Sequence, residues 1–159
     1  MIYVFLADGF EETEAIAPID MLRRAKLDVK LVGVGTSTPT SSHGIRVTAD
    51  LTEAETKLDS SVQLIVLPGG MPGTLNLEKS PFVQSAIKYC VENGIPVGAI
   101  CAAPSILGKL GLLNGRKAVC FPGFEQYLTG AEVLNKLCVT DGQFTTACGV
   151  GAAIEFGLE

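Results

Sequence analysis

The sequence predicts an α/β fold in which a mostly parallel sheet is covered by helices on both faces. Three observations predict it. Apolar, β-branched runs typical of buried strands alternate with segments of helical periodicity, and most runs end at turns rich in glycine or proline. The chain has 159 residues, of which 47% are hydrophobic and 18% charged, so it can form one compact domain, 1–159, with a sizeable core. Strands that are separated by helices pair in parallel and are buried on both faces.

The first half of the chain begins with a strand and a helix. Residues 2–7 are uniformly apolar, as a central strand would be. Apolar residues at helical spacing predict a helix over 13–25, where Pro18 implies either a kink or a later start. Further strands are expected at 28–34, at 45–51 (an edge or hairpin strand) and at 62–67, the last ending at Pro68-Gly69-Gly70.

The second half repeats the alternation. Residues 71–80 are predicted to form a loop, and Pro81 suits the first position of a helix that runs to Asn93 and stops at Gly94. A strand over 96–100 leads to Cys101 and then to a helix over 103–110. Short strands are expected near 117–121, 136–140 and 143–147, followed by a final helix over 150–158.

Charge and hydropathy argue against several classes of function. The formal net charge is −5, from 12 basic and 17 acidic residues without long runs of one sign, which does not indicate binding to nucleic acid or to an anionic membrane. No apolar segment is long enough to cross a bilayer. The apolar start lacks a basic region before it, so we expect a first strand rather than a signal peptide.

The five cysteines are odd in number and widely spaced, without a C-x-x-C pair, and His43 is the single histidine. Neither a structural metal site nor a disulfide framework is expected from this pattern, and no cofactor is expected. Scattered thiols suit a reducing compartment, so the expected location is cytoplasmic. The cysteines are at positions 90, 101, 120, 138 and 148.

Cys101 lies where the predicted strand turns sharply into a helix. Such a turn, a nucleophile elbow, holds a side chain at the end of a sheet where a substrate can reach it. A position at a helix N-terminus would lower the pKa of the thiol and favour the thiolate. The alternative is a small cysteine buried in the core.

Two other features are expected at the same edge of the sheet. In parallel sheets the ligand crevice lies beyond the carboxyl ends of the strands. The acidic loop after the first strand, the turn at 68–70 and Cys101 all fall at such ends. This convergence favours a functional Cys101.

Glu14 begins the first helix at this edge. A carboxyl group near a thiolate would have a raised pKa, and its proton could serve in general acid and base catalysis. The alternative makes Glu11, Glu12 and Glu14 ordinary first-turn acids, stabilised by the helix dipole.

Backbone and side-chain groups could assist the thiol. The N–H groups of Gly70 and Ala102 could form an oxyanion hole, and Gly69 would let the backbone approach a ligand, although these glycines also suit a simple turn. His43 and Arg24 could contact substrate. The alternatives are an ordinary loop histidine and an arginine that stabilises a helix C-terminus. The glycine-rich motifs of phosphate-binding loops are absent.

Three motifs in order resemble the ThiJ/PfpI superfamily, in the branch of the parkinsonism-associated protein deglycase and the bacterial YajL-type proteins. They are Gly9-Phe10-Glu11-Glu12-Thr13-Glu14, Leu67-Pro68-Gly69-Gly70 and Ala99-Ile100-Cys101-Ala102-Ala103-Pro104. The similarity runs from Met1 to the chain end. It implies a flavodoxin-like three-layer sandwich, usually a homodimer. Relatives continue into another helical segment, which is expected to be short or missing here.

The resemblance also implies roles for residues. Cys101 matches the family's oxidation-sensitive nucleophile, Glu14 its protonated glutamate, and Gly70 and Ala102 the backbone amides of the site. The implied activity is glyoxalase III or deglycase chemistry on methylglyoxal or glycated adducts, through a hemithioacetal at Cys101. The alternative is a redox-sensing, chaperone-like protein in which Cys101 is oxidised to sulfinate.

Two positions depart from other members of the superfamily. Protease-like members carry a histidine directly after the cysteine, where this chain has Ala102, so a peptidase is disfavoured. Some relatives have a histidine at the position of Phe121, and a histidine-assisted step is therefore not expected here.

Overall fold

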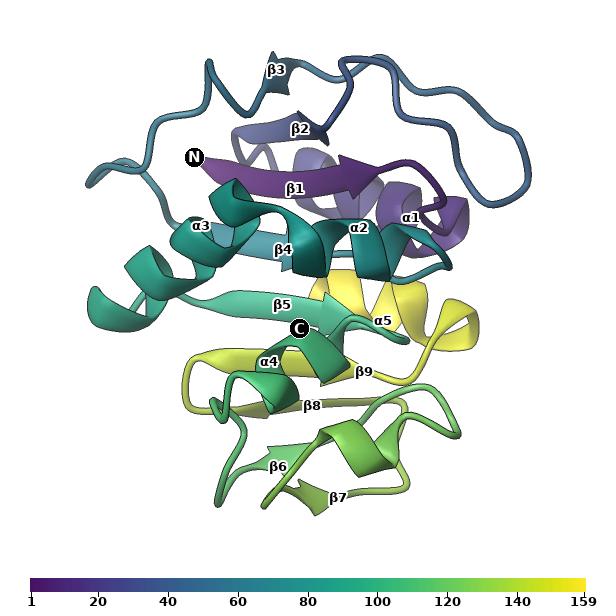
Figure 1. The fold of residues 1–159 in the computed structure, drawn as a ribbon, viewed down its shortest axis with the longest axis vertical. Coiled ribbons are helices and arrows are strands. Elements are labelled where there is room, and N and C mark those ends of the chain that lie inside the picture. The colour runs from purple at the N-terminus through teal and green to yellow at the C-terminus, as the bar shows by residue number, and fades with distance from the viewer.

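The computed structural model describes residues 1–159 and has a seven-stranded sheet at its centre (Figure 1). The spatial order is β3 (Leu51–Thr52), β2 (Val29–Val34), β1 (Ile2–Ala7), β4 (Leu64–Leu67), β5 (Val97–Ile100), β9 (Phe144–Ala147) and β8 (Cys138–Asp141). All neighbours are parallel except β8 and β9, which form an antiparallel pair. The mostly parallel sheet predicted from sequence is confirmed.

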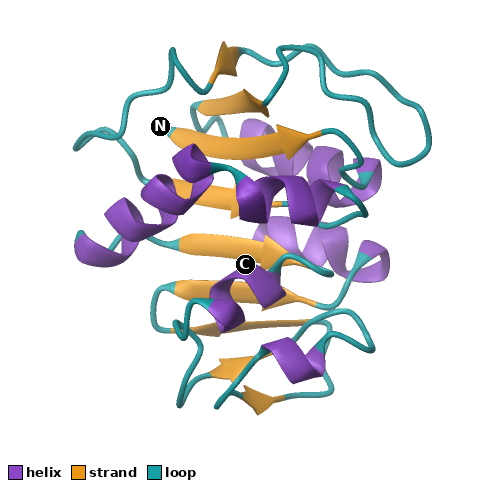
Figure 2. Cartoon of the chain, in the orientation of Figure 1, coloured by secondary structure: helices purple, strands orange, loops and turns teal.

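Helices cover both faces of this sheet, as Figures 1 and 2 show. On the near face lie α2 (Gly73–Lys79), α3 (Pro81–Glu92) and α4 (Pro104–Lys109), and on the far face α1 (Glu12–Arg24) and α5 (Ala153–Leu158). Each layer has its own core, one of 23 buried residues with Leu77 and Ile106, the other of 14 with Ile19 and Phe156. The three-layer sandwich is therefore confirmed.

The remaining elements are short. A two-stranded parallel sheet is formed by β6 (Lys117–Ala118) and β7 (Glu132–Val133), with the 3-10 helix η1 (Glu125–Tyr127) between them in the chain. A second 3-10 helix, η2 (Val150–Ala152), leads into α5. No helix has both the length and the apolar character needed to cross a membrane.

The two helices of the far face pack closely where a glycine permits it. A Cβ atom on Gly157 of α5 would lie 2.8 Å from the Cα of Pro18 in α1. Pro18 is inside α1, which already begins at Glu12 with Glu11 as its N-cap. The later helix start that Pro18 suggested is therefore wrong, because the cap at Glu11 sets the first turn.

Several predicted boundaries change in the structure. The predicted loop 71–80 contains α2, whose single buried large apolar residue, Leu77, is too weak a pattern to reveal a helix. Within the predicted strand 45–51, the N–H groups of Val47 and Ala49 donate to the carbonyls of residues 39 and 37, so this part folds back as an irregular hairpin. Only β3, at its end, joins the sheet. The predicted strand 117–121 ends at Ala118, and β7 and η1 were not expected.

The parallel strands place their loops at one edge of the sheet. Two long-range backbone hydrogen bonds connect these loops. The N–H of Glu11, after β1, donates to the carbonyl of Gly69, after β4, at 2.9 Å, and the N–H of Cys101, after β5, donates to the carbonyl of Ala147 in β9 at 2.8 Å. Loops from four strands are thereby held together at the carboxyl edge.

Candidate active site

Cys101 is held in a strained turn directly after β5. Its φ is 65°, in the left-handed region that costs a non-glycine residue about 1–2 kcal/mol. Its N–H is bonded to Ala147, and its carbonyl accepts from the N–H of Phe121 at 2.8 Å. These bonds fix the turn from both sides, as a nucleophile elbow requires.

Glu14 is fully buried in the first turns of α1, with 0% of its surface exposed. The side chain of Glu11 caps the helix by accepting the N–H of Glu14 at 2.7 Å. Neither carboxyl oxygen of Glu14 has a hydrogen-bond partner of ordinary geometry. The nearest groups that affect its pKa are the Cys101 thiol, the carboxylate of Glu11 and the backbone N–H groups of Gly69 and Val150.

Gly69 lies between these two side chains. A Cβ atom at this position would overlap Oε2 of Glu14 and would lie 2.5 Å from the Cβ of Cys101 and 2.9 Å from the carbonyl oxygen of Ile100. Only a glycine leaves room for both groups here. The same geometry shows that the Glu14 carboxyl and Cys101 flank one backbone position.

Burial raises the pKa of Glu14 to about 7, because the ionised form loses its hydration. The neighbouring Cys101 thiol and the N–H groups of Gly69 and Val150 oppose this rise, whereas the charge of Glu11 adds to it. Near neutral pH, Glu14 therefore exchanges between its acid and carboxylate forms, the range in which a group can both take and give a proton.

Burial also raises the pKa of Cys101, to about 12, and the carboxylate of Glu14 adds to the rise. The backbone N–H groups of Gly70 and Ala102 lower it, but they do not compensate. The expectation of a thiol pKa lowered by a helix N-terminus is therefore wrong. The helix α4 begins only at Pro104, and it has just six residues.

The pair can nevertheless generate a thiolate. When Glu14 takes a proton, its charge no longer repels the sulfur, and the carboxylic acid can donate a hydrogen bond to a thiolate. A proton that moves from Cys101 to Glu14 thus removes two of the causes that raise the thiol pKa. The arrangement suits a nucleophile that is deprotonated as it attacks, with Glu14 as the base.

The residues predicted from sequence fall into two groups. Gly69, Gly70 and Ala102 lie against the Cys101–Glu14 pair. Arg24 does not, because it is at the opposite end of α1, about 15 Å along the helix from Glu14, and is paired with Asp20 at 2.7 Å. The structure therefore does not bring Arg24 to Cys101.

His43 is near the first turn of α1 and is largely exposed. Its Nδ1 lies 2.8 Å from Oε1 of Glu12, so the ring is paired there and not with Cys101. Together with Glu11, these residues place three groups that could bind a metal ion within 4.8 Å of one another. Sequence spacing gave no sign of this, because the loop at 40–45 brings His43 to the helix.

Sequence reasoning missed two residues beside the pair. Val150 presents its N–H to Glu14, and a Cβ atom on Gly149 would lie 3.6 Å from Oε1 of Glu14 and 3.2 Å from the ring of Phe121. The late Gly149-Val150-Gly151 turn was a signal for this contact, but nothing in the sequence shows that it folds against α1.

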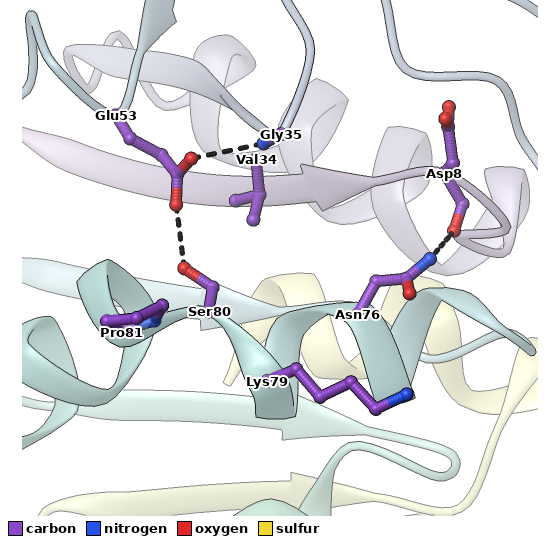
Figure 3. A pocket seen from close by; sticks show the side chains of 8 residues that line it. All are labelled: Asp8, Val34, Gly35, Glu53, Asn76, Lys79, Ser80 and Pro81. Atoms are coloured by element: carbon purple, nitrogen blue, oxygen red, sulfur yellow. Dashed lines mark hydrogen bonds between the residues drawn. The ribbon is translucent and has the colours of Figure 1, made fainter.

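The larger hollows of the molecule do not contain the pair. A polar pocket of about 370 Å³ lies between Asp8, Gly35 and Ser80 (Figure 3), and an apolar groove of about 520 Å³ runs between α1 and α5. A third hollow, of about 550 Å³, is bordered by Cys120 and Cys148. Cys101 and Glu14 line none of these three hollows. They meet at a junction of the loops that follow β1, β4 and β5.

Comparison with known proteins gives one consistent result. A model of the DJ-1/PfpI family matches residues 1–159. "Protein DJ-1 homolog B" of Arabidopsis thaliana is 39% identical over 99% of this chain, which spans 36% of that protein's length, and "Glutathione-independent glyoxalase DJR-1.2" of Caenorhabditis elegans is 31% identical over 94% of this chain and 80% of its own. The structure of oxidised Toxoplasma gondii DJ-1 matches with a TM-score of 0.89 and 34% identity, over 99% of this chain and 86% of that chain.

Proposed function

The chain belongs to the DJ-1/PfpI family, and from that premise we propose that it is a glutathione-independent glyoxalase that converts a small 2-oxoaldehyde to a 2-hydroxy acid through Cys101. The observation that carries this proposal is the fully buried carboxyl of Glu14 next to the thiol across Gly69. The 31% identical relative is named as such a glyoxalase, which supports the same reaction class.

The reaction begins at the aldehyde carbon. The sulfur of Cys101 adds to it, and the S–H proton passes to Glu14 and from there to the aldehyde oxygen, which becomes the hydroxyl of a hemithioacetal. Glu14 is then a carboxylate again. The N–H groups of Gly70 and Ala102, which lie against the sulfur, are suited to stabilise negative charge that develops beside it.

Glu14 then moves a proton between the two carbons of the adduct. Removal of the proton from C1 and its return to C2 convert the hemithioacetal to a thioester of the 2-hydroxy acid, with no external oxidant. Water hydrolyses the thioester and releases the acid and the free thiol. The sum is one 2-oxoaldehyde plus one water giving one 2-hydroxy acid, so no cofactor is consumed.

The direct test is a lactate assay with methylglyoxal. Wild-type protein should form lactate above a buffer control, and Cys101→Ser should reduce the rate to that control. Cys138→Ser is the matched control, because Cys138 is another half-buried free thiol, on the edge strand β8, and is not among the groups that affect Glu14. Equal rates for wild type and Cys101→Ser would contradict the proposal.

The same thiol could act on glycated adducts of amines, which contain the same carbon skeleton. Release of lactate from adducts purified away from free methylglyoxal would distinguish this deglycase activity from the glyoxalase. If lactate appears only at the rate at which the adducts dissociate in buffer, the activity is confined to the free aldehyde.

A second candidate is a redox sensor. It is favoured by the similarity to a structure of oxidised Toxoplasma gondii DJ-1. Here peroxide would oxidise Cys101 to sulfinate, and the sulfinate oxygens could accept hydrogen bonds from a protonated Glu14 and from nearby backbone N–H groups. Mass spectrometry after peroxide should then find sulfinate at Cys101 before other cysteines, whereas uniform oxidation of all five would exclude it.

We also propose that the chain forms a homodimer through the far helical face. Ile16 of α1 and Ile154 and Leu158 of α5 are large apolar side chains that the single chain leaves exposed. Light scattering should give a dimer mass, and Ile154→Asp should shift it to the monomer. A monomeric wild type would contradict this assembly.

A further inference from the structure

Three exposed apolar side chains belong to residues whose backbone lies next to the Cys101–Glu14 pair. Phe121 is 47% exposed, Val150 48% and Met71 47%. The backbone of each residue lies next to Cys101 or Glu14. The N–H of Phe121 donates to the carbonyl of Cys101, the N–H of Val150 lies near the Glu14 carboxyl, and Met71 directly follows Gly70, whose N–H lies against the thiol.

The ring of Phe121 is the largest of these surfaces. It packs against Gly149, because a Cβ atom at that position would lie 3.2 Å from the ring and 3.6 Å from Oε1 of Glu14. The ring and the carboxyl therefore border the same backbone position. An aromatic surface stands beside the group that would transfer the proton.

Phe121 is also supported from behind. Its ring lies 6.5 Å from that of Phe124 in an edge-to-face arrangement, and Phe124 lies 5.8 Å from the ring of Tyr127. The ammonium of Lys109 is 4.8 Å above the Tyr127 ring. This aromatic row limits the ways in which Phe121 can turn, so it can present a fixed apolar face although it is half exposed.

The two basic side chains that could bind an anionic substrate, Arg24 and His43, do not point at the Cys101–Glu14 pair. Arg24 is at the far end of α1, and His43 is paired with Glu12. A substrate carboxylate would thus find neither Arg24 nor His43 beside Cys101, whereas an apolar substituent would meet the ring of Phe121.

The geometry points to Phe121 as the wall of a subsite for an aromatic or bulky apolar substituent, so that the preferred substrates are aryl 2-oxoaldehydes such as phenylglyoxal rather than methylglyoxal. This inference rests on the proposed glyoxalase function and names its substrate class. Offset or edge-to-face contact of a substrate ring with Phe121 should give about a tenfold preference. The product from phenylglyoxal and water would be mandelate.

The first test does not need turnover. Intact mass measures the rates at which N-phenylmaleimide and N-ethylmaleimide alkylate Cys101, and the Cys101→Ser variant gives the contribution of the other thiols, which is subtracted. The phenyl-to-ethyl rate ratio for the protein is then divided by the same ratio for glutathione. Wild type should favour the phenyl reagent about tenfold over glutathione. Phe121→Ala should remove this preference, and Phe121→Leu, which keeps an apolar side chain, should retain part of it. Leu110→Ala, which removes an exposed apolar side chain outside the aromatic row, is the control.

The second test compares kcat/KM for phenylglyoxal and methylglyoxal, with mandelate and lactate measured by chromatography. Phe121→Ala should lower the phenylglyoxal value about tenfold and leave the methylglyoxal value within about threefold. A wild-type alkylation ratio equal to that of glutathione, or an equal loss for both aldehydes, would overturn the subsite. Selective alkylation without any turnover would support the subsite and contradict the glyoxalase function.

Discussion

Two polar sites at the carboxyl edge of the sheet differ in how their buried groups are satisfied. In the pocket of Figure 3, Glu53 accepts the hydroxyl of Ser80 at 2.6 Å and the N–H of Gly35 at 3.1 Å. At the junction of Cys101 and Glu14, the carboxyl of Glu14 is fully buried, and its neighbours are the Cys101 thiol and the N–H groups of Gly69 and Val150.

The difference teaches that burial beside a thiol separates a chemical carboxyl from a structural one, because Glu53 is only half-buried and is held by two loop groups. Burying an unpaired carboxylate is costly, and a residue whose role is to hold loops together would be hydrogen-bonded, as Glu53 is. Glu14 is instead left to change its protonation state. The larger pocket therefore has the character of a brace between β2, β3 and α3, and the junction that of a reaction site.

The largest effect we expect comes from Glu14→Gln. If Glu14 is the base for Cys101, its loss should lower kcat/KM for a 2-oxoaldehyde by about 100-fold or more. Glu53→Gln, the same change at the paired carboxyl, should leave kcat/KM within about twofold. Lactate or mandelate formation measures both.

The pH profile of wild type adds a check on this result. Because the pKa of Glu14 is about 7, kcat/KM should rise as the pH increases through 7 and the base becomes ionised. A Glu14→Gln variant that keeps both the rate and this rise would rule out Glu14 as the base.

The same pair of variants should differ in stability. The pKa of Glu14 is raised from 4.5 to about 7 by folding, so the native protein holds a proton that the unfolded chain has lost between these values. The contribution of protonated Glu14 to the free energy of unfolding is fully present below pH 4.5 and is lost as the pH rises through 7. The loss amounts to about 3 kcal/mol.

Glu14→Gln removes that dependence. Its free energy of unfolding relative to wild type should improve by about 3 kcal/mol between pH 4.5 and 8, as measured by urea denaturation. Glu53→Gln should instead lose about 1 kcal/mol at pH 7, since its hydrogen bonds to Ser80 and Gly35 are weakened. Parallel curves for Glu14→Gln and wild type would contradict the buried, protonated Glu14.

A glycine at each site gives a third comparison. Gly69→Ala places a Cβ against Glu14 and Cys101 and should cost about 2 kcal/mol of stability together with most of the activity. Gly35→Ala, in the polar pocket, meets no atom within 4 Å but has a φ of 78°, so it should cost about 1 kcal/mol and spare the activity. An active Gly69→Ala enzyme would show that the pair need not lie as close as the structure has it.

We expect the smallest effects on activity from Arg24 and His43, the two residues that the sequence analysis predicted as possible substrate contacts. Arg24→Ala removes one exposed i,i+4 ion pair with Asp20, which solvent screens, so stability should hardly change. His43→Ala removes an exposed pair with Glu12. Neither should change kcat/KM by more than about twofold, and a tenfold loss in either variant would extend the reaction site beyond the junction.

Much of this protein could be predicted without coordinates. Uniformly apolar runs at 2–7 and 96–100 determined the buried parallel strands, and Pro81 with Gly94 determined where α3 begins and ends, because these signals depend only on neighbours in the chain. The sharp turn at Cys101 was also local. Weak local signals failed, as at α2, where one buried leucine carries the pattern.

The chemistry of the site was decided by tertiary structure. Cys101 has a raised pKa and Glu14 is unpaired because loops after four different strands close around them and exclude water. The contacts of Phe121 and Val150 with this pair depend on the strand order, which sets residues far apart in the chain side by side. Sequence determines which groups a chain can offer, but hydration and charge at a buried atom are set by everything packed around it, and that is a property of the folded molecule alone.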